Sequence, residues 1–119
     1  MAPAPSVQMF AIKSSQAARA AERFFKERRI AIHYVDLQKK PMAAGEIRRF
    51  IEKYTLHGLL DTESKPYQDE GLKYMKMSDA QWLDRIAKYP QLLRLPLIRA
   101  GNKIAIGKDE EAWKALLTA

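Results

Sequence analysis

A strand pattern, a helix pattern and a second strand pattern follow one another in the first third of the chain, and this order constrains the fold most. Residues 7–12 (VQMFAI) and 31–37 (AIHYVDL) are apolar and β-prone. Between them, residues 16–29 place four apolar side chains at helical spacing: Ala17, Ala21, Phe24 and Phe25. Such a strand–helix–strand unit implies two parallel strands joined by a right-handed crossover.

The middle of the chain predicts helices. We expect a helical insert over about residues 43–90, which begins with a helix at 43–54. Residues 61–67 predict a loop, and residues 67–74 predict a short helix. Ser78 and Gln81 have the spacing of a capping box, so a further helix begins at Ser78, and Pro90 ends it.

The last third of the chain returns to strands. Residues 95–100 and 103–107 predict short strands, and Gly101-Asn102 predicts a tight hairpin turn between them. Asp109 then begins a final helix with Trp113 on its inner face. The expected fold class is therefore α/β, with a four-stranded mixed sheet in which a parallel half is joined to an antiparallel hairpin and helices flank the sheet.

Length and composition indicate one folded domain over residues 1–119, with 47% hydrophobic and 29% charged residues. Residues 1–6 (MAPAPS) predict a flexible lead-in and not a secretory signal, and no apolar run reaches membrane-spanning length. The chain has no cysteine, which excludes disulfides, cysteine zinc sites and thiol chemistry. We expect a monomer in the cytoplasm that does not bind membranes.

The net charge of +7 permits attraction to phosphates, acidic proteins or anionic surfaces. The basic residues are scattered and form no long run, so we favour a solvated basic surface and do not expect direct nucleic-acid binding. His33 and His57 lack metal-ligand spacing, and no glycine-rich phosphate loop is present. We therefore expect no metal site.

Several segments, taken in order, resemble the arsenate reductase/Spx family of thioredoxin-fold proteins, a bacterial-type family. They are residues 10–15 (FAIKSS), 20–30 (AAERFFKERRI), 64–67 (SKPY), 92–98 (LLRLPLI) and 101–107 (GNKIAIG). The resemblance extends from about residue 7 to residue 117. It implies a thioredoxin-like fold and a cis peptide bond before Pro96.

In that family the first strand leads to a cysteine at the N-terminus of the first helix. The helix dipole and free N–H groups stabilise its thiolate. In arsenate reductases the thiolate attacks arsenic and arginines neutralise the oxyanion. In Spx-like regulators a Cys-x-x-Cys pair acts as a redox switch.

In this chain the resemblance places Ser15 at the nucleophile position and Ala18 at the second cysteine. Leu95 stands where an arginine usually precedes the proline, with Arg94 one residue earlier. Lys108 stands where arginine is common, and Glu63 falls at a loop position that often carries arginine. These differences from the family fall at the positions of its catalytic residues. The residues that indicate the fold still match the family pattern.

The residues alone leave two roles for Ser15. A nucleophilic serine needs a general base, and neither histidine offers one convincingly, so we favour a helix N-cap. Four basic residues would ring the Ser15 loop in this fold: Lys13, Arg19, Arg94 and Lys108. They form either an anion site at the helix N-terminus or separate solvated charges, and both readings stay open.

Three functions follow from these observations. The first is a family member without thiol reductase activity, a binding or regulatory module for an unidentified protein partner or a small oxyanion, with no cofactor. The second is an oxidoreductase of the arsenate reductase type whose native cysteine or selenocysteine at position 15 is replaced by Ser15. Glutathione or thioredoxin would then be its co-substrate. The third, less favoured, is a transcription regulator that binds RNA polymerase.

Overall fold

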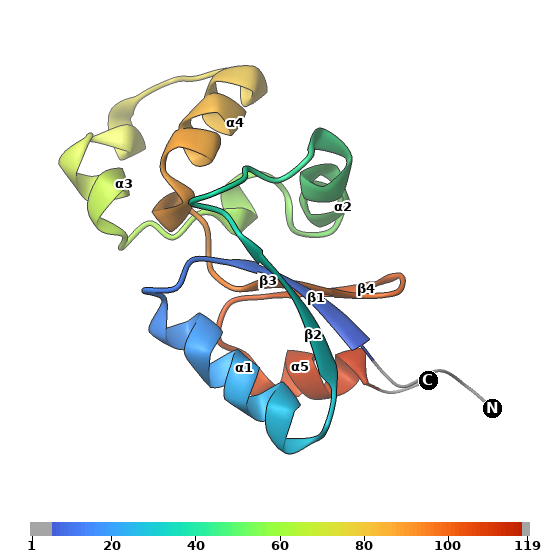
Figure 1. Cartoon of the computed structure of the whole chain (residues 1–119). Helices are drawn as coiled ribbons and strands as arrows, with labels where there is room; N and C mark the ends of the chain where they lie inside the picture. The colour runs from blue at the N-terminus through green and yellow to red at the C-terminus, as the bar shows by residue number, and fades with distance from the viewer. Residues whose placement is uncertain (1–5, 118–119) are drawn as a thin grey trace. The chain divides into compact units, whose positions relative to one another are not determined.

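The computed structural model describes residues 6–117, so residues 1–5 of the expected lead-in lie outside the described residues. The chain divides into two compact units (Figure 1). We call residues 6–36 and 95–117 the sheet unit, and Leu37–Arg94 the insert unit.

The sheet unit holds a four-stranded mixed sheet and two helices. Its elements are β1 (Ser6–Ala11), α1 (Gln16–Glu27), β2 (Ala31–Asp36), β3 (Leu97–Ala100), β4 (Lys103–Ile106) and α5 (Glu110–Leu116). The strand order is β2-β1-β3-β4; β1 pairs with β2 in parallel, and the other two pairs are antiparallel. The predicted α/β class and mixed sheet are confirmed. The sheet begins one residue early, since Ser6 of the expected lead-in pairs with Ala31.

One face of this sheet is covered by α1 and α5 (Figure 1). Strand alternation sends Val7, Met9 and Ala11 toward those helices. The Trp113 ring of α5 packs 5.4 Å from the Phe24 ring, measured between centroids. On α1 the first inward position is Ala18 and not Ala17 as predicted, because Ala18 is buried whereas Ala17 is only half-buried.

The first helix also ends earlier than predicted, at Glu27 instead of residue 29. Arg28 caps it, and Arg29 has a φ of 58°, in the left-handed region. Ile30 N–H then donates to the Phe25 carbonyl at 3.0 Å. A left-handed residue that closes the last turn of a helix in this way is commonly glycine. Because arginine stands at this position, the sequence did not indicate where α1 ends.

The insert unit is helical, as predicted. It contains α2 (Ala44–Tyr54), η1 (His57–Leu59), α3 (Lys65–Asp69), η2 (Leu72–Tyr74), α4 (Asp79–Lys88) and η3 (Pro90–Leu92). The capping box predicted at the start of α4 is present, with Ser78 and Gln81 each bonding the other's backbone. The Arg94 N–H donates to the Leu59 carbonyl at 2.8 Å and ties the C-terminal end of this unit to η1.

The prediction of a loop at 61–67 and a helix at 67–74 is wrong in detail. A short helix, α3, already begins at Lys65, with Pro66 in its first turn, where proline is tolerated because the first N–H groups have no helical partner. Gly71, at a φ of 61°, then breaks the helix before η2. Over residues 6–117, none of the helices is both long and apolar enough to cross a membrane.

Candidate functional site

The connection from β1 to α1 places Ser15 at the start of the helix. Ser15 N–H donates to the Ile12 carbonyl at 3.1 Å, which closes a tight turn. Ser15 has extended backbone angles, and its Oγ accepts a hydrogen bond from Ala18 N–H at 3.1 Å. Ser15 is therefore the N-cap of α1, and its side-chain oxygen satisfies a donor that the helix leaves unpaired.

The turn also fixes one of the basic candidates. The Arg19 Nε donates to the Lys13 carbonyl at 3.0 Å, so the guanidinium lies against the backbone of the turn. Lys13 and Arg19 line the same open depression, of about 540 Å³. Of the four predicted anion-binding residues, these two are brought together in the sheet unit.

The depression contains four further residues that the sequence did not single out: Glu22, Lys26, Ile32 and Tyr34. Lys26 pairs with Glu22 at 3.7 Å, so the charges of this depression are three basic and one acidic. Arg19, Glu22 and Lys26 lie at i, i+3 and i+7, a spacing that places them on one face of α1. The spacing along α1 and the side-chain alternation along β2 are the sequence signals from which this group of residues could have been predicted.

Tyr34 is the unusual group in this depression. Its hydroxyl is enclosed and has no hydrogen-bond partner among the described residues. Burial raises the pKa of the Tyr34 hydroxyl above its ordinary value, and the carboxylates of Glu22 and Asp36 add to the rise. The hydroxyl thus stays protonated and can only act as a neutral donor or acceptor at neutral pH.

The other two basic candidates do not line this depression. Lys108 is exposed between Gly107 and Asp109, which caps α5 by accepting from Ala112 N–H. Arg94 belongs to the insert unit, where its Nε donates to the Leu60 carbonyl at 3.0 Å. Its guanidinium therefore holds the backbone of that unit.

The resemblance also singled out residues 18, 63, 95 and 96. Ala18, which it places at the second cysteine position, is buried in the core of the sheet unit. The Leu95–Pro96 peptide bond is cis, and the Pro96 carbonyl accepts from Gly107 N–H at 3.0 Å. Glu63 is exposed, and its N–H donates to Asp61 Oδ1.

Among the described residues, neither histidine is hydrogen-bonded to Ser15. His33 is exposed on β2, and His57, in the insert unit, lies edge-on to Trp82 with ring centroids 5.6 Å apart. The hydrogen bond of Ser15 Oγ is one that it accepts from a backbone amide, and not one that it donates to an imidazole. Within residues 6–117, no group of three or more His, Asp or Glu side chains is placed to hold a metal ion.

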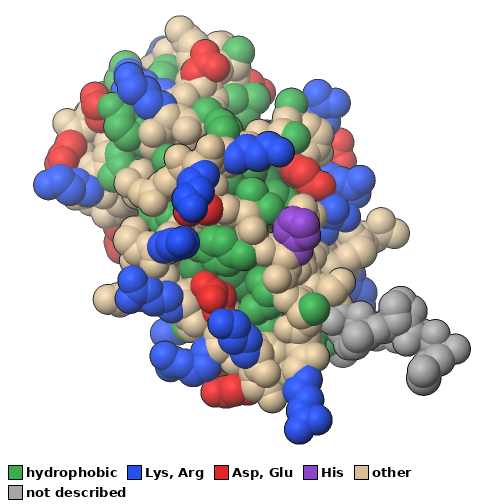
Figure 2. Space-filling model, viewed as in Figure 1, with side chains coloured by type: hydrophobic (Ala, Val, Ile, Leu, Met, Phe, Trp, Pro, Cys, Tyr) green, Lys and Arg blue, Asp and Glu red, His purple; other side chains and the backbone are tan. Residues whose placement is uncertain are grey.

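The surface charge is dispersed. Figure 2 shows Lys and Arg side chains spread over the viewed face and interspersed with Asp and Glu. Such mixing weakens any single-sign field, so local groups such as Lys13 and Arg19 decide where an anion is attracted.

Comparison with known proteins agrees with this fold. The sequence matches the ArsC family over residues 10–116. It is 28% identical over 116 residues to an arsenate reductase of Neisseria meningitidis, covering 95% of this chain and 99% of that protein. It is 25% identical over 114 residues to the global transcriptional regulator Spx of Streptococcus mutans, covering 93% and 82%.

Solved structures show the same fold. An arsenate reductase from Vibrio cholerae superposes with a TM-score of 0.82 at 16% identity, covering 97% of this chain and 100% of that one. A putative arsenate reductase from Yersinia pestis gives a TM-score of 0.78. The fold is thus the α/β, thioredoxin-like fold of these proteins, and with the family match over residues 10–116 it follows that the chain belongs to the ArsC family.

Proposed function

We propose that this protein is an ArsC-family member without thiol reductase activity, which acts as a monomeric binding or regulatory module in the cytoplasm. The observation that carries the proposal is the state of Ser15. The family resemblance places it at the nucleophile position, and its Oγ is engaged as the N-cap of α1 at 3.1 Å from Ala18 N.

Serine cannot take over the chemistry of a thiolate at this position. A helix N-terminus lowers the pKa of a side chain placed there by a few units at most. Such a shift is enough to ionise a thiol near neutral pH, but it leaves an alcohol protonated. Ser15 also lacks a hydrogen-bonded base. The chain has no cysteine at all, so it cannot form a mixed disulfide with glutathione or thioredoxin.

The ligand that the site favours is a small oxyanion or an acidic group of a protein partner. Lys13 and Arg19 provide two positive charges beside the N-terminus of α1, and Lys26 adds a third along the same depression. The same depression holds one carboxylate, Glu22, which is paired with Lys26. Binding through Lys13 and Arg19 does not require a nucleophile.

Two measurements test this function. First, the purified protein is assayed for arsenate reduction with glutathione and glutaredoxin or with thioredoxin as reductant; we expect no turnover, and robust turnover would refute the proposal. Second, phosphate and arsenate are titrated while backbone amide signals are followed by NMR. We expect saturable shifts at residues 13–19.

A matched pair of variants locates the oxyanion. Arg19→Gln removes a charge that lines the depression, and Arg23→Gln removes an exposed charge from the same helix that does not line it. Arg19→Gln should weaken phosphate binding, whereas Arg23→Gln should not. Equal effects of the two variants would mean that only net charge matters, and the proposed binding site would be withdrawn.

A second candidate is a thiol-linked oxidoreductase with a native cysteine or selenocysteine at position 15. The placement of Ser15 at the N-terminus of a 12-residue helix favours it, because that placement would stabilise a thiolate. The codon for residue 15 in the source genome decides between the two, since a serine codon removes this candidate. A third, less favoured candidate is a transcription regulator that binds RNA polymerase, because the chain is similar to the global transcriptional regulator Spx. Recovery of RNA polymerase subunits with the tagged protein would support it, and recovery of none would count against it.

A further inference from the structure

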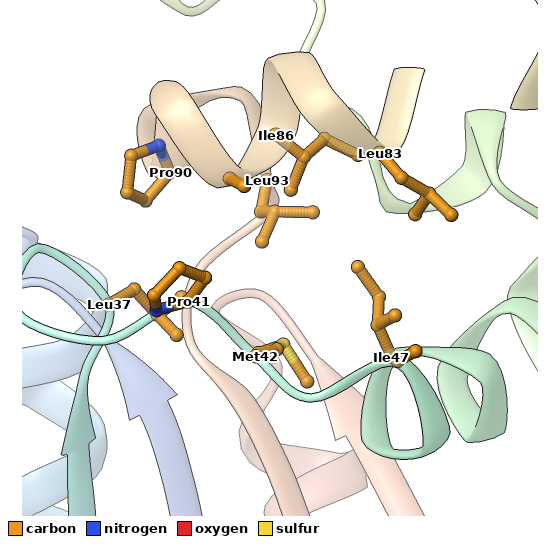
Figure 3. Close-up of a pocket in the computed structure, with 10 residues that line it drawn as sticks. Leu37, Pro41, Met42, Ile47, Leu83, Ile86, Pro90 and Leu93 are labelled. Atoms are coloured by element: carbon orange, nitrogen blue, oxygen red, sulfur yellow. The ribbon is translucent and has the colours of Figure 1, made fainter. Parts of the chain in front are cut away.

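The insert unit contains an apolar pit that the Ser15 site does not involve. Its floor is formed by five buried side chains: Leu37, Ile47, Ile86, Pro90 and Leu93. Its mouth is formed by five exposed or half-buried ones: Pro41, Met42, Ala44, Leu83 and Ala87. Figure 3 shows Ile47 of α2 facing Leu83 and Ile86 of α4 across the open space. The pit is open on one side, and its volume is about 140 Å³.

The lining offers almost nothing to hold water. All ten side chains are apolar, and Pro41 and Pro90 have no backbone N–H to donate. The Leu93 N–H is already used, since it donates to the Pro90 carbonyl at 3.0 Å. A water molecule needs two to four polar partners to be held in a cavity, so water in this pit is poorly bound and its displacement by an apolar group is favourable.

The size of the pit limits what it can accept. An apolar cavity of about 150 Å³ binds benzene, whereas sites for drug-sized ligands measure about 300–1,000 Å³. The pit, at about 140 Å³, therefore fits one small ring or a short branched hydrocarbon group. A charged ligand is disfavoured, because no lining group would compensate for its lost hydration.

The residues at the mouth of the pit favour a free small molecule over a docked protein as its ligand. A stable protein interface covers about 800 Å² on each partner and has an apolar centre. Among the described residues, the large hydrophobic side chains that are exposed are Tyr74 and Met75, and neither lines the pit. The exposed residues at the mouth are small or compact: Pro41, Ala44 and Ala87. No large exposed hydrophobic side chain among the described residues thus extends the apolar surface of the pit at its mouth.

We propose that this pit is a binding site for a small, uncharged, apolar molecule about the size of a single aromatic ring. The ligand would be held by contact with Ile47, Ile86 and Leu93 and would enter between Ala44 and Ala87. The site is separate in sequence and in lining from Lys13 and Arg19, so it stands whether or not the oxyanion proposal holds.

The test uses toluene as the probe and benzoate as its charged counterpart, with the full chain labelled at leucine and isoleucine methyl groups. Toluene should produce saturable shifts in the methyl signals of Leu83, Ile86 and Leu93. Benzoate should leave these signals unchanged. Absence of saturable shifts with toluene up to its solubility, or equal shifts with benzoate, would overturn the proposal.

Two variants fill the mouth and one serves as a control. Ala87→Phe places a ring at the mouth from α4 and should weaken toluene binding by about tenfold or more, because the ring takes up the space that toluene needs. Ala80→Phe makes the same change at an exposed position of α4 outside the lining and should leave binding unchanged. If Ala87→Phe disturbs folding, Ala44→Phe fills the mouth from α2 instead. Undiminished binding in folded blocked variants, or equal loss in Ala80→Phe, would contradict the assignment.

Discussion

At the scale of a single residue, the enclosed hydroxyl of Tyr34 has a measurable cost. It is buried without a hydrogen-bond partner, and an unpaired buried polar group destabilises a folded protein. Tyr34→Phe should therefore raise the free energy of unfolding by about 1 kcal/mol at pH 7, measured by chemical denaturation. Tyr74→Phe removes a hydroxyl from a side chain that is 85% exposed and should change stability little. A destabilised Tyr34→Phe variant would show that the hydroxyl has a partner.

The same residue predicts a pH dependence. Burial, with help from the Glu22 and Asp36 carboxylates, raises the pKa of Tyr34 in the folded protein. Above the unfolded value of about 10, the unfolded chain loses this proton while the folded chain keeps it, so stability falls as pH rises. The advantage of Tyr34→Phe should therefore widen above about pH 10. An advantage that stays constant or shrinks over this range would contradict the assigned shift.

Position 15 predicts how an introduced thiol behaves. Ser15→Cys puts the thiol at the N-terminus of α1, near Lys13 and Arg19, and its pKa should fall below the ordinary value of about 8.5. Arg23→Cys, exposed in the middle of the same helix, supplies the comparison. Thiolate absorbance followed against pH gives both values. If the two thiols have the same pKa, the N-terminus of α1 does not stabilise an anion. Both the oxyanion site and the reductase alternative would then lose their electrostatic support.

At the scale of elements, two serines that look alike in sequence should differ. Ser78 accepts from Gln81 N–H at 3.2 Å, and Gln81 Oε1 accepts from Ser78 N–H at 2.8 Å, so α4 has a full capping box. Ser64 occupies the same position before α3 but makes no capping bond. Ser78→Ala should cost about 1 kcal/mol of unfolding free energy. Ser64→Ala removes a buried hydroxyl that has no hydrogen-bond partner among the described residues, so it should not lower the stability and should raise it if it changes it at all. Equal losses in chemical denaturation would mean that Ser64 also caps its helix in solution.

The elements that the sequence predicted well have strong periodic or capping signals. The strand over β1 is an apolar, β-prone run, the helix after Ser15 combines helical periodicity with an N-cap, and the helix after Ser78 begins with a capping box. Two errors show the limit of these signals: Arg29 adopts the left-handed conformation that glycine usually takes, and Pro66 lies in the first turn of a helix where a loop was predicted. Such choices depend on surrounding packing, which local sequence does not report.

The candidate site was predictable only in part for a similar reason. The N-cap at Ser15 is a local feature, so its sequence position was enough to predict it. The grouping of Lys13 and Arg19 with Tyr34 depends on β2 lying parallel beside β1, and the partner of Arg94 is a carbonyl 34 residues away. Long-range placement of this kind followed from the family resemblance only as an expectation.

At the scale of the whole molecule, the two tryptophans make cooperativity measurable. Trp82 is buried in the insert unit and Trp113 is buried in the sheet unit, so each unit carries one fluorophore. The proposal that the chain is a single domain requires the two units to unfold together. Two single-tryptophan variants, Trp82→Phe and Trp113→Phe, allow each unit to be followed separately.

In each variant, tryptophan fluorescence reports one unit while far-ultraviolet circular dichroism reports the helices of both. If the chain unfolds as one domain, the two signals should have the same denaturant midpoint within each variant, even though each substitution lowers that midpoint. The comparison is internal to each protein, so the destabilisation caused by removing a buried ring does not affect it. Fluorescence and dichroism midpoints that separate in either variant would show that Leu37–Arg94 unfolds independently of the sheet, and the single-domain proposal would fail.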